Sequence, residues 1–249
     1  MKRDYRFSSI FWILLIVGVT NYLLTRLFDV IGEDNFVIGV LVSLITAIIS
    51  FVFSFSISSG LIRNRMGSIG DYLNQVNYLN MKVLTVGFVV AVVRAIIDYV
   101  FTASGAVSLI TAAANPNNSS VFAIGAIILP IIVVLVIVII AMFFVYTNFY
   151  LADHYDTEDG VMTIIGKIFS QGKRLFKKTL ILGLKWEGIP LLIYILSLGL
   201  LLLVKDEFVG LGLFAFFTLA YAIAALITAI IFVARLSDIY LDDKINIEE

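Results

Sequence analysis

The sequence predicts an all-α integral membrane protein, a polytopic bundle of six transmembrane helices arranged as three hairpins. Of its 249 residues, 61% are hydrophobic and 14% are charged, and the mean hydropathy is +1.06. Soluble domains are about 45–50% apolar and about 25% charged, so this composition favours a membrane protein. Apolar runs of about 20 residues recur along the chain, each long enough to cross a hydrocarbon core of about 30 Å.

The hydropathy pattern gives the position of each span. The spans are expected near residues 8–28, 36–61, 81–103, 121–146, 180–204 and 208–234. All six are expected to be helices, because an open strand in lipid leaves backbone groups without partners. The first run lacks an Ala-x-Ala ending, so we expect a retained span rather than a cleaved signal peptide. Residues 1–249 then form a single transmembrane domain with amphipathic connectors at 62–80 and 147–179.

The distribution of positive charge predicts the orientation. An even number of spans puts both termini on one side, and a cytoplasmic N-terminus puts both long connectors there too. Of the 17 Lys and Arg residues, all but three then lie on the cytoplasmic side. The exceptions are Arg26 and Lys205 on the outer side and Arg94 inside the third span. This bias follows the positive-inside rule, so we expect cytoplasmic N- and C-termini.

Two internal similarities suggest that the hairpins are repeats. Residues 66–88 align without a gap to residues 162–184, with eight of 23 positions identical, among them Gly70/Gly166, Gln75/Gln171 and Lys82/Lys178. A second similarity relates the segment after span four to the segment after span six. It matches Leu151/Leu236, Asp153/Asp238 and Tyr155/Tyr240. Parallel repeats of this kind occur in transporters but are not confined to them.

The second connector carries the pattern of a basic amphipathic helix. Apolar residues recur every three or four positions from Val161 to Phe176, and the opposite face carries Gln171 and five cations. These candidate lipid-headgroup ligands are Lys167, Lys173, Arg174, Lys177 and Lys178. Such a helix can lie on the inner leaflet and attract anionic lipid, or it can serve only as an elbow that orients its hairpin.

The segment from Phe149 to Gly188 carries a recognisable series of residues. It contains Tyr150-Leu151-Ala152-Asp153 leaving a span, then Ser170, Gly172 and Lys173 on a helix, Leu175-Phe176, Leu182-Gly183-Leu184 and Trp186. In these features it resembles a family of Firmicute multi-span membrane proteins related to the membrane domain of glycerophosphoryl diester phosphodiesterases. The resemblance implies an envelope protein that handles or organises lipid. It implies no catalytic residues, because the phosphodiesterase domain of those relatives is absent from this sequence.

Charged residues within the spans are the other candidate site. Arg94 and Asp98 are four residues apart and share one face of the third span. A charge near the membrane centre costs at least about 2.5 kcal/mol, so this pair either lines a functional cavity or forms a structural ion pair. Lys185 and Glu187, near the inner end of span five, are secondary candidates.

The sequence offers little for catalysis or for a cofactor. Cysteine is absent, and the single histidine, His154, lies in an acidic loop without the spacing of a calcium site. We therefore expect no enzyme, metal or cofactor, and a multi-pass protein of the bacterial cytoplasmic membrane that organises or moves lipid or another amphiphile. The alternative is a transporter, or the membrane subunit of one, with Arg94 and Asp98 in the pathway. The expected partners are anionic lipids, together with another protein or a second copy of the chain, and not nucleic acid.

Overall fold

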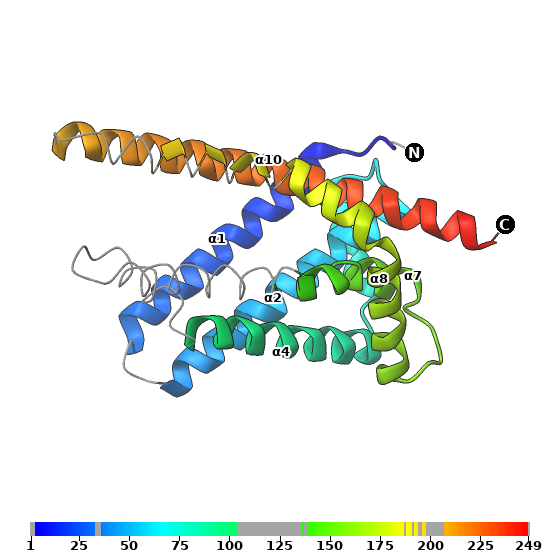
Figure 1. Cartoon of the computed structure of the whole chain (residues 1–249). Helices are drawn as coiled ribbons and strands as arrows, with labels where there is room; N and C mark the ends of the chain where they lie inside the picture. Colours follow the sequence, from blue (N-terminus) through cyan, green and yellow to red (C-terminus); the bar gives the residue numbers. More distant parts are fainter. Residues whose placement is uncertain are drawn as a thin grey trace, which may run out of the picture. The chain divides into compact units, whose positions relative to one another are not determined.

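The computed structural model describes residues 3–32, 36–103, 136, 139–186, 188–190, 192–193, 196–197 and 207–248. Every regular element in these ranges is helical, which confirms the all-α prediction (Figure 1). Within the described ranges, three helical stretches are long and apolar enough to cross a membrane: Phe7–Leu27, Leu44–Arg63 and Gly212–Asn246. The predicted fourth span, 121–146, and the outer part of the fifth, 180–204, lie largely outside the described residues.

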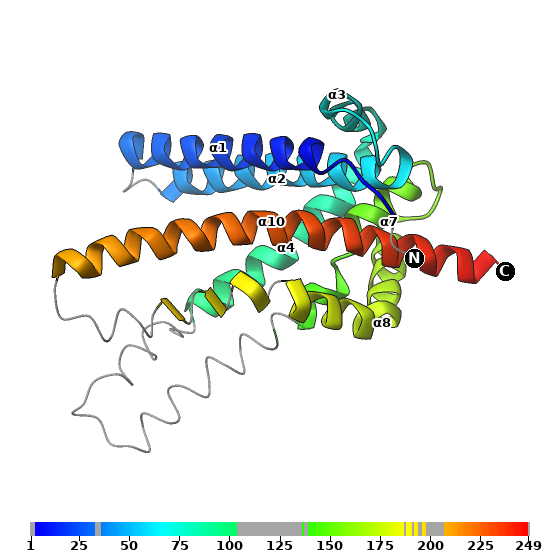
Figure 2. The same ribbon diagram turned by 90° about the horizontal axis from the view of Figure 1, so that it is seen from above.

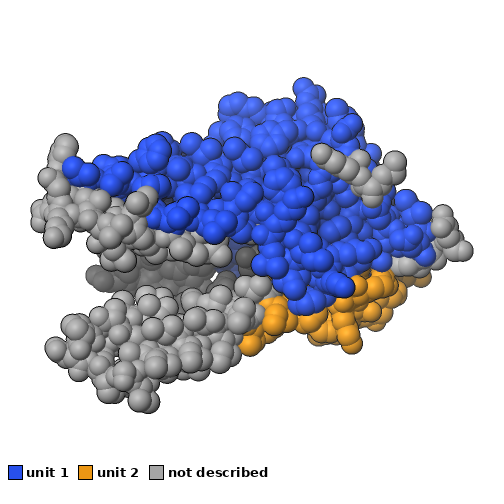
Figure 3. Space-filling model, turned by 45° about the horizontal axis from the view of Figure 1, so that its top comes forward, with its two compact units in different colours: residues 1–79, 148–155, 175–249 blue, residues 80–147, 156–174 orange. Residues whose placement is uncertain are grey.

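The chain divides into two compact units, coloured separately in Figure 3. Unit 1 comprises residues 1–79, 148–155 and 175–249, and unit 2 comprises residues 80–147 and 156–174. Each unit is described by itself below.

Helices α1 (Phe7–Gly32) and α2 (Phe36–Arg63) form the first hairpin of unit 1. They run side by side in opposite directions (Figure 2), and the amide of Asn21 donates to the hydroxyl of Ser50 at 3.0 Å between them. Their outer faces expose large apolar side chains, among them Trp12 and Leu23. Exposed apolar surface on a 26-residue helix fits contact with lipid.

A tight elbow follows α2. Helix α3 (Ile69–Leu73) begins with a capping box in which Ser68 and Asp71 satisfy each other's backbone N–H groups. The 3-10 helix η1 (Asn74–Tyr78) ends at Leu79, and α4 (Met81–Ala103) starts after this break in the helical structure. The side chain of Asn80 accepts a hydrogen bond from the Val83 N–H at 2.9 Å and so caps α4.

Tyr72 fixes this elbow to α2. Its ring is fully buried against Gly60, its hydroxyl donates to the Arg65 carbonyl at 3.0 Å, and its own carbonyl accepts from the Ser56 hydroxyl. The absence of a side chain at Gly60 is what lets the ring lie directly on the helix.

We expect Gly60→Ala to destabilise the protein by about 1–3 kcal/mol, the usual cost of overpacking a filled site. The new Cβ would lie 2.4 Å from Cδ1 of Tyr72, whose hydroxyl is held by Arg65. Gly70→Ala is the control, because the nearest atom to its Cβ would be 3.7 Å away. Unfolding midpoints in mild detergent compare the two variants, and equal midpoints would contradict this account of Gly60.

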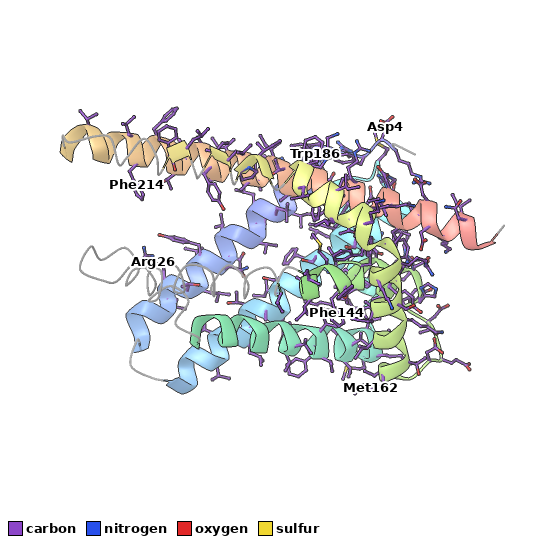
Figure 4. The ribbon with its side chains drawn as sticks, in the orientation of Figure 1. Asp4, Arg26, Phe144, Met162, Trp186 and Phe214 are labelled. Carbon is purple, nitrogen blue, oxygen red and sulfur yellow. The ribbon has the colours of Figure 1, made fainter. Side chains whose placement is uncertain are left out.

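Helix α10 (Glu207–Glu248) has 42 residues and is about 63 Å long at 1.5 Å per residue. The sequence analysis placed a span at 208–234 and a polar tail after it, whereas the structure continues the same helix through the tail. The half that begins at Glu207 exposes large apolar side chains such as Phe214 (Figure 4) and Leu219. The other half is the buried part, from Ile230 to Asp243.

The core of unit 1 accordingly lies at one end of its long helices. Buried positions gather at the start of α1, at the end of α2 and in the second half of α10. The opposite ends of these helices are largely exposed within the described residues. The polar contacts described below lie in this core.

Helices α7 (Thr147–Asp153) and α8 (Val161–Trp186) form the second connector. Helix α8 runs without a break past residue 180, where the sequence analysis placed the start of span five. The two segments aligned at a shift of 96 therefore differ in shape, because 66–88 is broken at Leu79 and 162–184 is one helix. The position of the capping residue Asn80 corresponds to Phe176, whose side chain cannot cap a new helix.

Candidate functional site

One face of α8 is buried along its length. Ile164, Ile168, Leu175 and Thr179 are each at most 1% exposed and recur at spacings of four, seven and four. Gln171, predicted on the basic face, belongs instead to this buried face with an exposure of 8%. The neighbouring residue, Gly172, lies so close to the Phe143 carbonyl that a Cβ there would be 2.1 Å from its oxygen.

The predicted cations of α8 all lie on its exposed side. They are Lys167, Lys173, Arg174, Lys177 and Lys178. The ammonium of Lys167 lies 2.5 Å from the Asp159 carboxylate. The hydrogen bond from Lys167 is the main cause of the lowered pKa of Asp159. The charge of Lys167 is therefore partly neutralised by Asp159. We call the surface formed by the exposed side chains of Lys173, Arg174, Lys177 and Lys178 the basic face.

An exposed apolar strip adjoins the basic face on the same helix. Met162 is 77% exposed and Phe169 is 42% exposed. Met162 and Trp186, both labelled in Figure 4, mark the two ends of α8. A helix with a buried stripe, an exposed apolar strip and a basic face has the surface that interfacial helices use to meet anionic lipid.

The loop before α8 is held by hydrogen bonds within unit 2. Lys82 donates to the Thr157 carbonyl at 2.6 Å, and the Thr157 hydroxyl donates to Asp159 at 3.2 Å. Among the described residues no group of three or more His, Asp or Glu side chains could hold a metal ion.

His154 lies in unit 1 and packs on its own helix end. Its ring stacks on Tyr150 with centroids 4.3 Å apart, and its Nδ1 lies 3.1 Å from the Tyr150 carbonyl oxygen. His154 Nδ1 also lies 3.8 Å from the Asp153 carboxylate. These contacts give the ring a local packing role.

The other two predicted pairs are only partly described. Arg94 and Asp98 both lie in α4, four residues apart, and their side chains are outside the described set. Lys185 is exposed, and its ammonium lies 5.4 Å from the Trp186 ring centroid. Glu187 is outside the described residues.

The core of unit 1 holds a buried ionic cluster that the sequence analysis did not single out. Asp238 is 7% exposed and binds Arg65 at 2.8 Å and Arg235 at 2.6 Å. Arg65 also donates to the Ser237 hydroxyl at 2.7 Å. Burial lowers the pKa of the Arg65 guanidinium, while the charge of Asp238 opposes that shift. A more exposed pair, Arg3 with Asp242 at 2.7 Å, lies one turn further along α10.

Two further groups of contacts lie in unit 1, one around Asp153 and one around Arg63. The Tyr240 hydroxyl donates to Asp153 at 3.0 Å, and Lys244 binds the same carboxylate at 2.9 Å. The Arg63 guanidinium lies over two rings that contact each other edge-on, 4.1 Å from the Tyr78 centroid and 4.8 Å from the Tyr155 centroid. The similarity between residues 151–155 and 236–240 pointed to Asp153, Asp238 and Tyr240. The sequence analysis used Arg63 and Arg65 only as orientation signals.

No protein-family model, curated protein or solved structure matches this chain. The resemblance to the Firmicute membrane family stays a prediction.

Proposed function

We propose that this protein is a non-enzymatic, six-span protein of the bacterial cytoplasmic membrane that organises or moves lipid or another amphiphile. In this proposal both termini are cytoplasmic and the basic face of α8 binds anionic lipid headgroups. The observation that carries the proposal is the surface of α8, where Lys173, Arg174, Lys177 and Lys178 are all exposed opposite a buried stripe.

The arrangement of α8 supports lipid contact over a role limited to orienting the hairpin. An elbow needs only the buried stripe, whereas α8 also exposes the apolar side chain of Met162 and part of the Phe169 ring. Apolar side chains at the edge of a basic face insert between headgroups while the cations stay at the phosphate level. Among the residues that the structure describes, three further helices long and apolar enough to span a membrane support the placement of the chain there.

The test compares two triple variants at Lys173, Lys177 and Lys178. One variant replaces all three with Gln and removes the charge, and the other replaces all three with Arg and keeps it. Each lysine near anionic lipid contributes about 1 kcal/mol, so the Gln variant should bind anionic lipid roughly a hundred-fold more weakly. Binding of phosphatidylglycerol and phosphatidylcholine to the purified protein in detergent is measured by native mass spectrometry.

We expect the parent protein and the Arg variant to retain phosphatidylglycerol in preference to phosphatidylcholine, and the Gln variant to lose that preference. If all three proteins preferred phosphatidylglycerol over phosphatidylcholine to the same extent, the basic face would be rejected as the lipid site. A cysteine-accessibility assay for the C-terminus, made possible by the absence of native cysteine, checks that the Gln variant keeps the parental orientation.

A further inference from the structure

The end of α2 carries the same residue spacing as the two related segments near α7 and in α10. The three segments are Leu61-Ile62-Arg63-Asn64-Arg65, Leu151-Ala152-Asp153-His154-Tyr155 and Leu236-Ser237-Asp238-Ile239-Tyr240. Each has leucine at its first position, a charged residue at its third, and arginine or tyrosine at its fifth. We call these segments clasp 1, clasp 2 and clasp 3. All three belong to unit 1.

The three leucines are buried to the same extent. Leu61 is 0% exposed, and Leu151 and Leu236 are each 2% exposed. The first position is therefore a core position in every clasp, as a structural repeat requires.

The third and fifth positions pair from one clasp to the next in a single direction. Arg63 of clasp 1 lies over the Tyr155 ring of clasp 2 at 4.8 Å. Asp153 of clasp 2 accepts from Tyr240 of clasp 3 at 3.0 Å. Asp238 of clasp 3 accepts from Arg65 of clasp 1 at 2.8 Å, which closes the ring.

In two of the three links, the residue at the second position of one clasp also accepts a hydrogen bond from the neighbouring clasp. Arg63 of clasp 1 also donates to the Ala152 carbonyl of clasp 2 at 2.8 Å. Arg65 of clasp 1 donates to the Ser237 hydroxyl of clasp 3 at 2.7 Å. The links differ in chemistry, as a cation–π contact, a neutral donor on a carboxylate and an ion pair. What repeats is the geometry of the pairing.

We propose that the chain carries a threefold internal repeat, in which the three clasps form a head-to-tail ring within unit 1. Head-to-tail contacts between equivalent units close into a ring when the rotation between units completes a circle. Because every clasp contributes a third position to one neighbour and a fifth position to the other, no clasp can leave without breaking two links. The elbows that follow clasps 1 and 2 have diverged, as the break at Leu79 and the continuous α8 show.

The direction of the ring makes the proposal testable by cross-linking. Because the chain has no cysteine, pairs of cysteines can be introduced without background. The forward pairs are Arg63→Cys with Tyr155→Cys, Asp153→Cys with Tyr240→Cys, and Asp238→Cys with Arg65→Cys. The reverse pairs combine the same six substitutions the other way: 63 with 240, 153 with 65, and 238 with 155.

We expect a short bis-maleimide to link all three forward pairs in intact membranes and none of the reverse pairs. Forward and reverse sets contain the same single substitutions, so a general loss of structure affects both sets alike. Cross-linking of the reverse pairs as fast as the forward pairs, or of only one forward pair, would overturn the ring.

A milder pair of substitutions gives a second measurement in case the cysteine variants do not fold. Tyr240→Phe removes the hydroxyl that joins clasp 3 to clasp 2, and Asp153→Asn replaces its charged acceptor by a weaker neutral one, while both changes keep side-chain shape. The ring predicts that the double variant loses less in melting temperature than the two single losses added together, because the second change removes an already broken link. Asp153→Asn with Arg65→Gln, a reverse pair, should show additive losses, and the opposite pattern in these two cycles would reject the proposal.

Discussion

Asp238→Ala is expected to destabilise the protein by about 3–5 kcal/mol, the cost of removing one partner from a buried ionic group. The carboxylate is 7% exposed and lies between Arg65 and Arg235, whose side chains are 12% and 18% exposed. Removing it leaves two guanidinium groups in the core without their counter-charge. The free energy of unfolding, measured by titration with sodium dodecyl sulfate from mild-detergent micelles, reports the loss.

Asp242→Ala is the matched control, because it removes the same residue type one turn along the same helix. Asp242 binds Arg3 at 2.7 Å, but these side chains are 29% and 23% exposed. Water solvates such a pair well, so its loss should cost no more than about 1 kcal/mol. Equal losses in the two variants would show that burial of the Asp238 cluster contributes nothing.

The fold class could be predicted because it depends on composition and period. Runs of about 20 apolar residues leave helices as the only secondary structure that satisfies the backbone in lipid, and α1, α2 and the first part of α10 are found where hydropathy placed them. The ends of helices depend on local capping. Asn80 caps a new helix in one connector and Phe176 cannot cap one in the other, so similar sequences give a broken helix in one case and a continuous helix in the other.

The basic face of α8 could also be predicted, because charge on an amphipathic helix follows a fixed period. The period did not predict that Gln171 would be buried, because glutamine is polar and was therefore assigned to the polar face. The close approach of the Phe143 backbone at Gly172, next to Gln171, is not visible in the sequence. The Asp238 cluster depends on contacts between residues more than 170 positions apart, such as Arg65 with Asp238. Hydropathy carries no information on such pairs. The spacing shared by residues 151–155 and 236–240 indicated Asp238, but nothing in the sequence indicated that Arg65 would bind it.

Gly172→Ala is expected to destabilise the protein by about 1–3 kcal/mol, as overpacking of a filled interior does. The added Cβ would lie 2.1 Å from the Phe143 oxygen and 2.6 Å from its carbonyl carbon. These are backbone atoms, which cannot turn aside as a flexible side chain can, so the two segments must separate. The contact between the Phe143 and Phe169 rings, with centroids 4.8 Å apart, would weaken at the same time.

Gly166→Ala on the same helix should have the opposite sign. No atom lies within 4 Å of the Cβ it would add, and alanine stabilises a helix interior by up to about 1 kcal/mol relative to glycine. Both variants replace glycine by alanine within α8, so the gain in helix propensity is the same and only the contact with Phe143 differs. The free energy of unfolding of each variant is measured by titration with sodium dodecyl sulfate. A Gly172→Ala variant as stable as Gly166→Ala would mean that α8 does not pack closely on Phe143. If the expected difference is found, close packing of Gly172 on Phe143 keeps the stripe of α8 buried. The cations on the opposite side of the helix then stay exposed to the solvent or the lipid.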